Sequence, residues 1–285
     1  MSGPDGVGLG FVKAHAYGND FLLVDERDLA RAATGAVAVA RAACHRTHGI
    51  GADGLIIFRR TADGAVMTLF NADGSHAELS GNGLRCLAAL IAETRRDEQP
   101  AVSGDDIAIE TDAGPRTLAL LEAAPARFTF RAFMGEPSDL GQREIDVGSE
   151  SVAAVVLSVG NPQCIVLTPS LDDARFRRLG PALATHHAFP AGTNVAFVEV
   201  ERPDRARILV WERGVGATAA SGTGACASGV AAAAYGGADR QLDVVSPGGA
   251  QRVEWREDGI YLTGWAELTA RGHWFGGHPD ASRSD

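Results

Sequence analysis

The fold is decided by the stretch Asn71-Ala-Asp-Gly-Ser-His-Ala-Glu-Leu-Ser80-Gly81-Asn82-Gly83-Leu-Arg-Cys86, which runs into the apolar segment 87–92. This segment favours a helix, so a hydroxyl residue and a Gly-x-Gly bend stand at a helix N-terminus. Backbone N–H groups at such a bend, with the helix dipole, form a seat for a carboxylate or phosphate. Ser80 stands at the rim of that seat. Because Ser and Gly cap many ordinary helices, this stretch alone is a weak signal.

A second copy of the pattern strengthens it. Ser221-Gly222-Thr223-Gly224 leads into the small, helix-compatible segment 227–234. Four landmarks recur in the second half at nearly the same distance along the chain: Ser80 with Ser221, Asn19 with Asn161, Asp53 with Asn194, and Asn71 with Glu212. Asn71 lies nine residues before Ser80, and Glu212 lies nine residues before Ser221. So long a period predicts two duplicated lobes and not a solenoid. Chance recurrence of Gly-rich turns is the alternative, and it does not account for four landmarks.

Bulk composition excludes several classes of protein. The 285 residues suffice for one large domain or two ordinary ones, and 45% hydrophobic residues suffice for a substantial core. A net charge of −10 argues against nonspecific nucleic-acid binding. We find no secretory signal or membrane span, and four widely spaced cysteines fit a reduced, cytoplasmic protein. Lys13 is the only lysine, which argues against pyridoxal phosphate; we expect no cofactor and no metal.

Periodicity predicts a mixed α/β order of elements. We expect strands or hairpins at 11–25, 55–58, 65–70, 107–121, 126–134, 152–159, 195–200 and 206–211, and helices at 29–43 and 171–183 and after each serine. Glu122–Pro125 is the best linker candidate between the lobes.

Two further motifs are rejected. Cys44-His45-x-x-His48 lacks a fourth metal ligand at usable spacing, so we interpret it as a polar helix end. Gly49-Ile-Gly51-Ala-Asp53-Gly54 has the spacing of a dinucleotide fingerprint, but a strand follows it where that fingerprint needs a helix.

With these motifs in order, the chain resembles the diaminopimelate epimerase family over about residues 11–275. The resemblance rests on residues 18–21, 49–53, 71–74, 81–83, 134–137, 160–162, 194–195, 212–216 and 222–224. It implies an α/β (α+β) fold of two pseudo-symmetric lobes, each a curled, mostly antiparallel sheet around a central helix, with the substrate in the cleft between them. We therefore expect an N-terminal lobe at 11–125 with a returning strand at 266–277, a C-terminal lobe at 126–265, and flexible tails at 1–10 and 278–285.

The resemblance also implies a reaction: PLP-independent interconversion of LL- and meso-2,6-diaminopimelate, for lysine and peptidoglycan precursor biosynthesis. One base removes the α-proton and an acid on the opposite face returns one, while the helix N-termini stabilise the growing negative charge. Family members use two cysteines, because a thiol near a helix N-terminus ionises close to neutral pH.

Here the chain departs from the family, because serine stands at both positions, Ser80 and Ser221, and Gln163 replaces a histidine. A serine hydroxyl is too weak an acid to act as the base unaided, so we expect this form to be inactive or strongly impaired. Glu212 lies near Ser221 by analogy. An introduced Cys→Ser exchange and a natural, non-catalytic paralogue are both open; replacement at only these two cysteine positions favours the former.

By the same resemblance, the polar residues line the substrate site. They are Asn19, Asn71, Gly81, Asn82, Asn161, Asn194, Glu212, Arg213, Gly222 and Thr223, with Ser80, Ser221, Gln163 and Glu212 as the catalytic candidates. So many amides with a guanidinium suit a doubly zwitterionic ligand such as diaminopimelate. The alternatives are another cofactor-independent amino-acid racemase, such as a proline racemase-like enzyme, and an amino-acid-binding protein. The expected partner is a small molecule, not nucleic acid or membrane; a homodimer is an open alternative to a monomer.

Overall fold

The computed structural model describes residues 8–31, 35–98 and 106–276, which form two compact units. Unit 1 holds the described residues up to Phe130 and from Trp265 onward, and unit 2 holds Arg131–Gly264. We expected the boundaries at 125/126 and 265/266. The linker prediction was wrong, because Glu122–Pro125 lies inside unit 1, where the Ala124 N–H donates to the Arg127 carbonyl at 2.8 Å.

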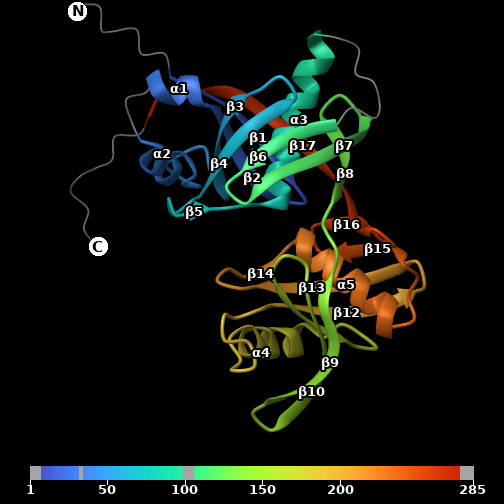
Figure 1. Ribbon diagram of the computed structural model, residues 1–285. Helices are drawn as coiled ribbons and strands as arrows, with labels where there is room; N and C mark the ends of the chain where they lie inside the picture. Colours follow the sequence, from blue (N-terminus) through green and yellow to red (C-terminus); the bar gives the residue numbers. More distant parts are fainter. Residues whose placement is uncertain (1–7, 32–34, 99–105, 277–285) are drawn as a thin grey trace, which may run out of the picture. The chain divides into compact units, whose positions relative to one another are not determined.

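Unit 1 is built from strands around the long helix α3 (Figure 1). Its elements are β1 (Leu9–Ala16), β2 (Asn19–Asp25), α1 (Glu26–Arg31), α2 (Ala36–Ala43), β3 (Gly54–Arg60), β4 (Gly64–Asn71), β5 (His76–Ala77), α3 (Gly81–Glu98), β6 (Asp106–Thr111) and β7 (Gly114–Ala123). Two more strands, β8 (Arg127–Phe133) and β17 (Gly259–Trp274), carry the chain across the boundary between the units.

Unit 2 repeats this plan around helix α5. Its elements are β9 (Ser138–Val147), β10 (Glu150–Ser158), β11 (Pro162–Leu167), α4 (Asp173–Ala184), β12 (Asn194–Arg202), β13 (Arg205–Glu212), β14 (Gly216–Thr218), α5 (Gly222–Tyr235), β15 (Gln241–Ser246) and β16 (Gly249–Arg256).

Strand pairing shows that the two units are repeats. In unit 1, β17, β1, β2, β3 and β4 are paired in that order, and β4 then pairs with both β5 and β6 before β7 follows β6. In unit 2 the same sequence of pairings runs through β9, β10, β11, β12, β13, β14, β15 and β16. The parallel pairs fall at the same two places, β2–β3 and β4–β6 against β11–β12 and β13–β15. The expected mostly antiparallel sheet around a central helix is confirmed for each unit.

Register places the landmarks of the repeat. Gly54 pairs with Asn71 across β3 and β4, and Val195 pairs with Trp211 across β12 and β13, so Asn71 and Glu212 end equivalent strands. Phe21 pairs with Gly54, and Gln163 with Asn194. The residue equivalent to Asn194 is therefore Gly54, one position beyond the Asp53 that we predicted.

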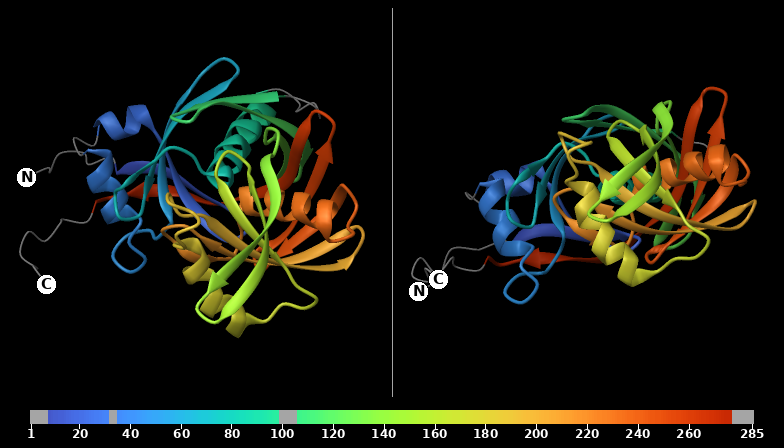
Figure 2. Two further views of the ribbon diagram at one scale, coloured as in Figure 1. Left: turned by 60° about the horizontal axis from the view of Figure 1, so that its bottom comes forward. Right: turned by 90° about the horizontal axis from the view of Figure 1, so that it is seen from below.

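Alternation along the strands gives each sheet two covered faces. In unit 2, Ile165 and Ala196 pack with α5, whereas Cys164 and Phe197 pack with α4 on the other face (Figure 2). In unit 1, Leu22 and the alternate residues of β3 pack against α2, and α3 contacts β1, β2, β4, β6 and β7.

The central helices are buried on all sides over most of their length, and α5 is also largely apolar. Every described residue of α3 from 82 to 92 is buried, as is every residue of α5 from 224 to 232. A helix without a polar face must be enclosed by its protein. Small residues allow the close approach: a Cβ at Gly229 would lie 2.8 Å from Val253 Cγ1. These helices fix the positions of Ser80 and Ser221.

Four other expectations need correction. The predicted helix 29–43 is not continuous, since α1 ends at Arg31 and α2 begins after Gly35. The tail predicted at 1–10 was wrong at Leu9 and Gly10, which lie in β1; residues 1–7 and 277–285 are outside the described residues. β17 begins at Gly259 rather than 266 and ends at Trp274, and β9, β15 and β16 were not predicted.

Candidate functional site

Ser80 caps the N-terminus of α3. The Gly83 N–H donates to Ser80 Oγ at 3.1 Å, and the Leu84 N–H donates to the Ser80 carbonyl at 2.8 Å. The hydroxyl therefore satisfies one of the free N–H groups of the first turn. Ser80 and Gly81 are half-buried, so this helix end stays accessible from solvent within unit 1.

Asn19 and Asn82 are joined at this helix end. Asn82, two residues beyond Ser80, is buried, and its Nδ2 donates to Asn19 Oδ1 at 3.3 Å. Asn19 begins β2 directly after the two-residue turn Tyr17–Gly18, in which both residues have positive φ, as a tight hairpin turn requires. Buried Arg85 donates to Asn82 Oδ1 at 3.1 Å. Asn19, which the resemblance assigns to the substrate, therefore contacts the first turn of α3.

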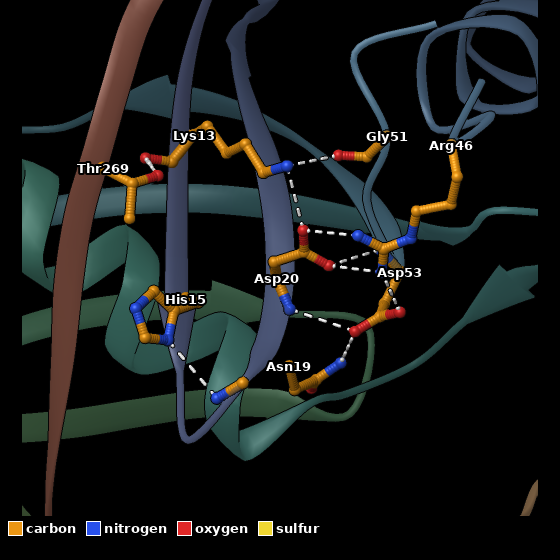
Figure 3. Close-up of polar contacts among 9 residues, drawn as sticks. Lys13, His15, Asn19, Asp20, Arg46, Gly51, Asp53 and Thr269 are labelled. Atoms are coloured by element: carbon orange, nitrogen blue, oxygen red, sulfur yellow. Dashed lines mark hydrogen bonds and ion pairs between the residues drawn. The ribbon is translucent and has the colours of Figure 1, made fainter. Parts of the chain in front are cut away.

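An ion cluster holds Asn19 from the other side (Figure 3). Asn19 Nδ2 donates to Asp53 Oδ2 at 2.8 Å, and the Arg46 guanidinium bridges Asp53 Oδ1 and Asp20 Oδ1, each at 2.7 Å. Lys13 Nζ lies 3.1 Å from Asp20 Oδ2. Burial alone would raise the pKa of Asp20, but the hydrogen bonds from Arg46 and Lys13 outweigh it and lower the pKa. The cluster thus stays ionic and fixes the Asn19 amide.

Asn71 lies apart from this network in its hydrogen bonding. It ends β4, is exposed, and its Nδ2 donates to Ser75 Oγ at 2.9 Å. Among the described residues, no Asp or Glu side chain forms a hydrogen bond with Ser80.

Ser221 caps α5 in the equivalent way, but with a different neighbour. Its Oγ accepts from the Gly224 N–H at 3.3 Å, and the residue is only 4% exposed. The Ser221 hydroxyl also forms a hydrogen bond with the Glu212 carboxylate. Burial raises the pKa of Glu212, and the hydrogen bond from Ser221 opposes that rise. This half-site therefore pairs a serine with an acid whose pKa lies above its usual range.

Asn161, Gln163 and Thr223 form a neutral cluster at the same helix end. Gln163 Nε2 donates to Asn161 Oδ1 at 2.7 Å and to Thr223 Oγ1 at 3.3 Å, and Asn161 Nδ2 lies 3.4 Å from Thr223 Oγ1. Thr223 is two residues beyond Ser221, as Asn82 is beyond Ser80, so the Asn19–Asn82 contact recurs as Asn161–Thr223. Gln163 is 1% exposed, and its Oε1 has no partner among the described residues.

Asn194 and Arg213 form the remaining pair. Asn194 Oδ1 accepts from the Arg213 backbone N–H at 2.9 Å, and the exposed Arg213 side chain donates from Nη1 to the Ala191 carbonyl at 2.6 Å. The predicted site residues thus form one group in unit 1, which consists of Ser80, Gly81, Asn82 and Asn19. In unit 2 they form a second group, which consists of Ser221, Gly222, Thr223, Glu212, Asn161 and Gln163, and a separate pair, Asn194 and Arg213.

The native cysteines are poor candidates for the missing bases. All four are buried, and none forms a disulfide with another described residue. Burial raises the pKa of Cys44 and of Cys164 to about 12, and also raises the pKa of Cys86. Within residues 8–31, 35–98 and 106–276, no group of three His, Cys, Asp or Glu is placed to hold a metal, and no helix is long and apolar enough to cross a membrane. His45 instead accepts from the backbone N–H groups of Thr47 and His48.

Sequence reasoning missed Arg46, Asp53 and Arg85 as neighbours of the site. Asp53 belongs to the Gly49–Gly54 motif, which we rejected as a dinucleotide signal and used for the repeat and the family resemblance, but did not assign to the site. In the structure, the Asp53 carboxylate of this motif accepts a hydrogen bond from Asn19. The Gly51 carbonyl of the same motif accepts one from Lys13 Nζ at 2.7 Å. Nothing local in the sequence points to Arg46.

Comparison with known proteins gives one family. The diaminopimelate epimerase family model matches residues 11–138 and 155–269. A diaminopimelate epimerase from Desulforudis audaxviator is 39% identical over 282 residues, covering 93% of this chain and 98% of the relative. One from Synechococcus elongatus is 39% identical over 272 residues, covering 90% and 94%.

Solved structures share the fold at low sequence identity. A predicted epimerase from Pseudomonas aeruginosa superposes with a TM-score of 0.67 at 15% identity, covering 93% of this chain and 98% of that one. A hydroxyproline epimerase from Agrobacterium vitis, with bound trans-4-hydroxy-L-proline, gives 0.64 at 14% identity, covering 93% and 90%.

Proposed function

The chain belongs to the diaminopimelate epimerase family, and from that premise we propose that it is built to interconvert LL- and meso-2,6-diaminopimelate by a two-base mechanism without PLP. The observation that supports this most is the repeated half-site. In each unit a serine caps a buried central helix, and an asparagine from a hairpin earlier in the chain contacts the residue two positions after that serine. Inversion at carbon needs one proton-transfer group for each face, and a duplicated half-site supplies two.

The helix N-termini would bind and activate the α-carboxylate. α3 has 18 residues and α5 has 14, and each carries unsatisfied N–H groups and a partial positive charge at its first turn. When the α-proton leaves, negative charge moves onto the carboxylate oxygens. Fixed N–H donors stabilise that charge more in the transition state than in the substrate, which is the condition for catalysis.

Serine at both positions removes most of the reactivity. A thiol of ordinary pKa about 8.5 is close to ionisation at neutral pH, whereas a hydroxyl is not. Gln163 cannot take a proton either, because an amide has no basic site at this pH. We therefore propose that the serine form binds diaminopimelate but does not epimerise it at a measurable rate.

The distal ammonium and carboxylate would be recognised by the polar groups that remain. Arg213 offers a planar guanidinium suited to a carboxylate, and Asn194 holds its backbone. Gln163 Oε1 is a buried acceptor without a partner among the described residues, suited to a substrate N–H. Asn19 and Asn71 would add amide contacts. The chain would serve lysine and peptidoglycan precursor synthesis in the cytoplasm, a setting that suits four cysteines that form no disulfide with another described residue.

Two measurements test the proposal. Calorimetry should show that the serine form binds LL- or meso-diaminopimelate, and a double variant with Ser80→Cys and Ser221→Cys (the cysteine variant) should epimerise either isomer. A serine form that does not bind either isomer would refute the assignment of substrate. A cysteine variant that binds but never epimerises would favour the non-catalytic, amino-acid-binding paralogue, with Gln163 as the remaining obstacle. Faster turnover of proline than of diaminopimelate would favour the racemase alternative.

A further inference from the structure

The two half-sites are equivalent in backbone but not in proton-accepting groups. Asn71 and Glu212 end equivalent strands, nine residues before their serines. Glu212 is a carboxylate joined to Ser221 by a hydrogen bond. Asn71 is an amide, and its Nδ2 is turned to Ser75 Oγ at 2.9 Å. Within the part of the chain that the structure describes, only Ser221 therefore has an ionisable hydrogen-bond partner.

The other carboxylates of unit 1 do not repair this difference. Asp20 and Asp53 are held by the Arg46 guanidinium, and their remaining contacts go to Lys13, to Asn19 and to backbone N–H groups. Among the described residues, the only hydrogen bond of Ser80 Oγ is the one accepted from the Gly83 N–H. Ser80 thus serves as a cap, and no described side chain is hydrogen-bonded to it to take its proton.

We propose that the serine form retains a second activity, the exchange of the substrate α-proton with solvent on one face only and with retention of configuration. This rests on the proposed function, since it takes diaminopimelate as the substrate. It requires only the unit 2 half-site. A chain with one working base removes a proton and returns a solvent proton to the same face, so no epimer forms.

The proton path can be written in full. The Cα–H bond breaks and its proton passes to Ser221 Oγ, while the Ser221 hydroxyl proton passes to the Glu212 carboxylate. The electron pair of the broken bond is delocalised into the α-carboxylate, which the α5 N-terminus stabilises. Before the reverse step, Glu212 exchanges its proton with water, and the substrate-derived proton on Ser221 Oγ exchanges in turn with the proton held by Glu212. The reverse path then delivers a solvent proton from Ser221 Oγ to the same face. No oxidant, reductant or cofactor takes part.

The surroundings of Glu212 suit this role. Ser221 is 4% exposed, and Glu212 is half-buried. Burial raises the pKa of Glu212, which makes its carboxylate a stronger base than an exposed one. The Ser221 Oγ is held on its other side by the Gly224 N–H at 3.3 Å, which leaves the hydroxyl proton directed to Glu212.

The test follows exchange and inversion separately. LL-, DD- and meso-diaminopimelate are each incubated with the serine form in D₂O; proton NMR reports loss of the α-H signal, and chromatography on a chiral phase reports the isomer composition. We expect α-H loss at centres of one configuration only, and an unchanged isomer composition. Loss at both configurations, or appearance of an epimer at the rate of exchange, would overturn the proposal.

Variants identify the base. Glu212→Gln should slow exchange by about 100-fold or more, the usual contribution of a positioned base. The matched control Glu144→Gln, at an exposed glutamate of the same unit, should exchange at the rate of the parent. Because Glu212→Gln keeps shape and hydrogen bonding to Ser221, circular dichroism should show an intact fold. An undiminished rate in folded Glu212→Gln would refute the role of Glu212.

The cysteine variant separates the two hypotheses. If it epimerises diaminopimelate while the serine form shows no exchange at any centre, the proposed function stands and this inference is wrong. If neither form binds the substrate, both are wrong.

Discussion

Replacing each serine by alanine should have unequal effects on stability, although the two positions are equivalent in the repeat. Ser80→Ala removes a helix cap at a half-buried position, and losing such a cap costs about 1 kcal/mol. Ser221→Ala removes a cap and also the hydrogen bond to the half-buried Glu212 carboxylate, a bond of about 1.5–3 kcal/mol when one partner is charged. We therefore expect Ser221→Ala to lower the free energy of unfolding by about 2.5–4 kcal/mol.

The larger loss should depend on pH. Burial holds the folded-state pKa of Glu212 above its unfolded value, so the ionised carboxylate destabilises the fold at neutral pH. The destabilisation disappears as the pH falls from the folded pKa to the unfolded one. Without Ser221 the pKa of Glu212 rises further, so more stability is lost at pH 7 and more is regained on acidification. The difference between the two alanine variants should accordingly be smaller at pH 5 than at pH 7.

Unfolding in urea, followed by circular dichroism, measures both losses. Since the chain has two units, amide hydrogen exchange of α3 and α5 assigns each loss to its own unit. A Glu212→Gln background provides the control, because the pH dependence of the Ser221→Ala loss should vanish there. Equal losses at both serines at pH 7, or a Ser221→Ala loss that is the same at pH 5, would show that Glu212 and Ser221 are not coupled.

Three further predictions concern ligand and thiols. Arg213→Lys should weaken diaminopimelate binding by about 1–3 kcal/mol in calorimetry, because lysine keeps the charge but lacks the planar fork; unchanged affinity would mean that this side chain does not touch the ligand. Asp53→Asn should weaken binding by about 1 kcal/mol, since it weakens the anchor of Asn19; an affinity equal to that of the parent would assign Asp53 to stability alone. In the cysteine variant, a thiol reagent should label position 80, which is half-buried, far faster than the four cysteines of the parent chain, which are buried; mass spectrometry of labelled peptides decides this, and rapid labelling of one of those four cysteines would contradict it.

Several features of the fold followed from the sequence because they depend on local chemistry. Ser80 and Ser221 were predicted as helix starts because a hydroxyl followed by small residues and an apolar run is a capping pattern, and capping involves residues three or four positions apart. The repeat was visible because its landmarks recur at nearly one offset. Strands such as β3 and β12 were predicted from continuous apolar runs, which a sheet covered on both faces requires.

Other features depend on pairing over long distances in the chain, and only the tertiary structure decided them. β9 was missed because it is polar and mostly exposed, and it is held by backbone pairing with β10 rather than by burial. The bridge from Arg46 to Asp20 spans 26 residues and exists because β2 and β3 are neighbours. Likewise, Glu212 and Asn71 each lie nine residues before their serines, so the spacing is the same for both. Only the tertiary structure shows that the Glu212 carboxylate contacts Ser221, whereas the Asn71 amide is turned away from Ser80. Side-chain partners are set by strand register and by the packing of each sheet on its helix, and these are properties of the assembled unit.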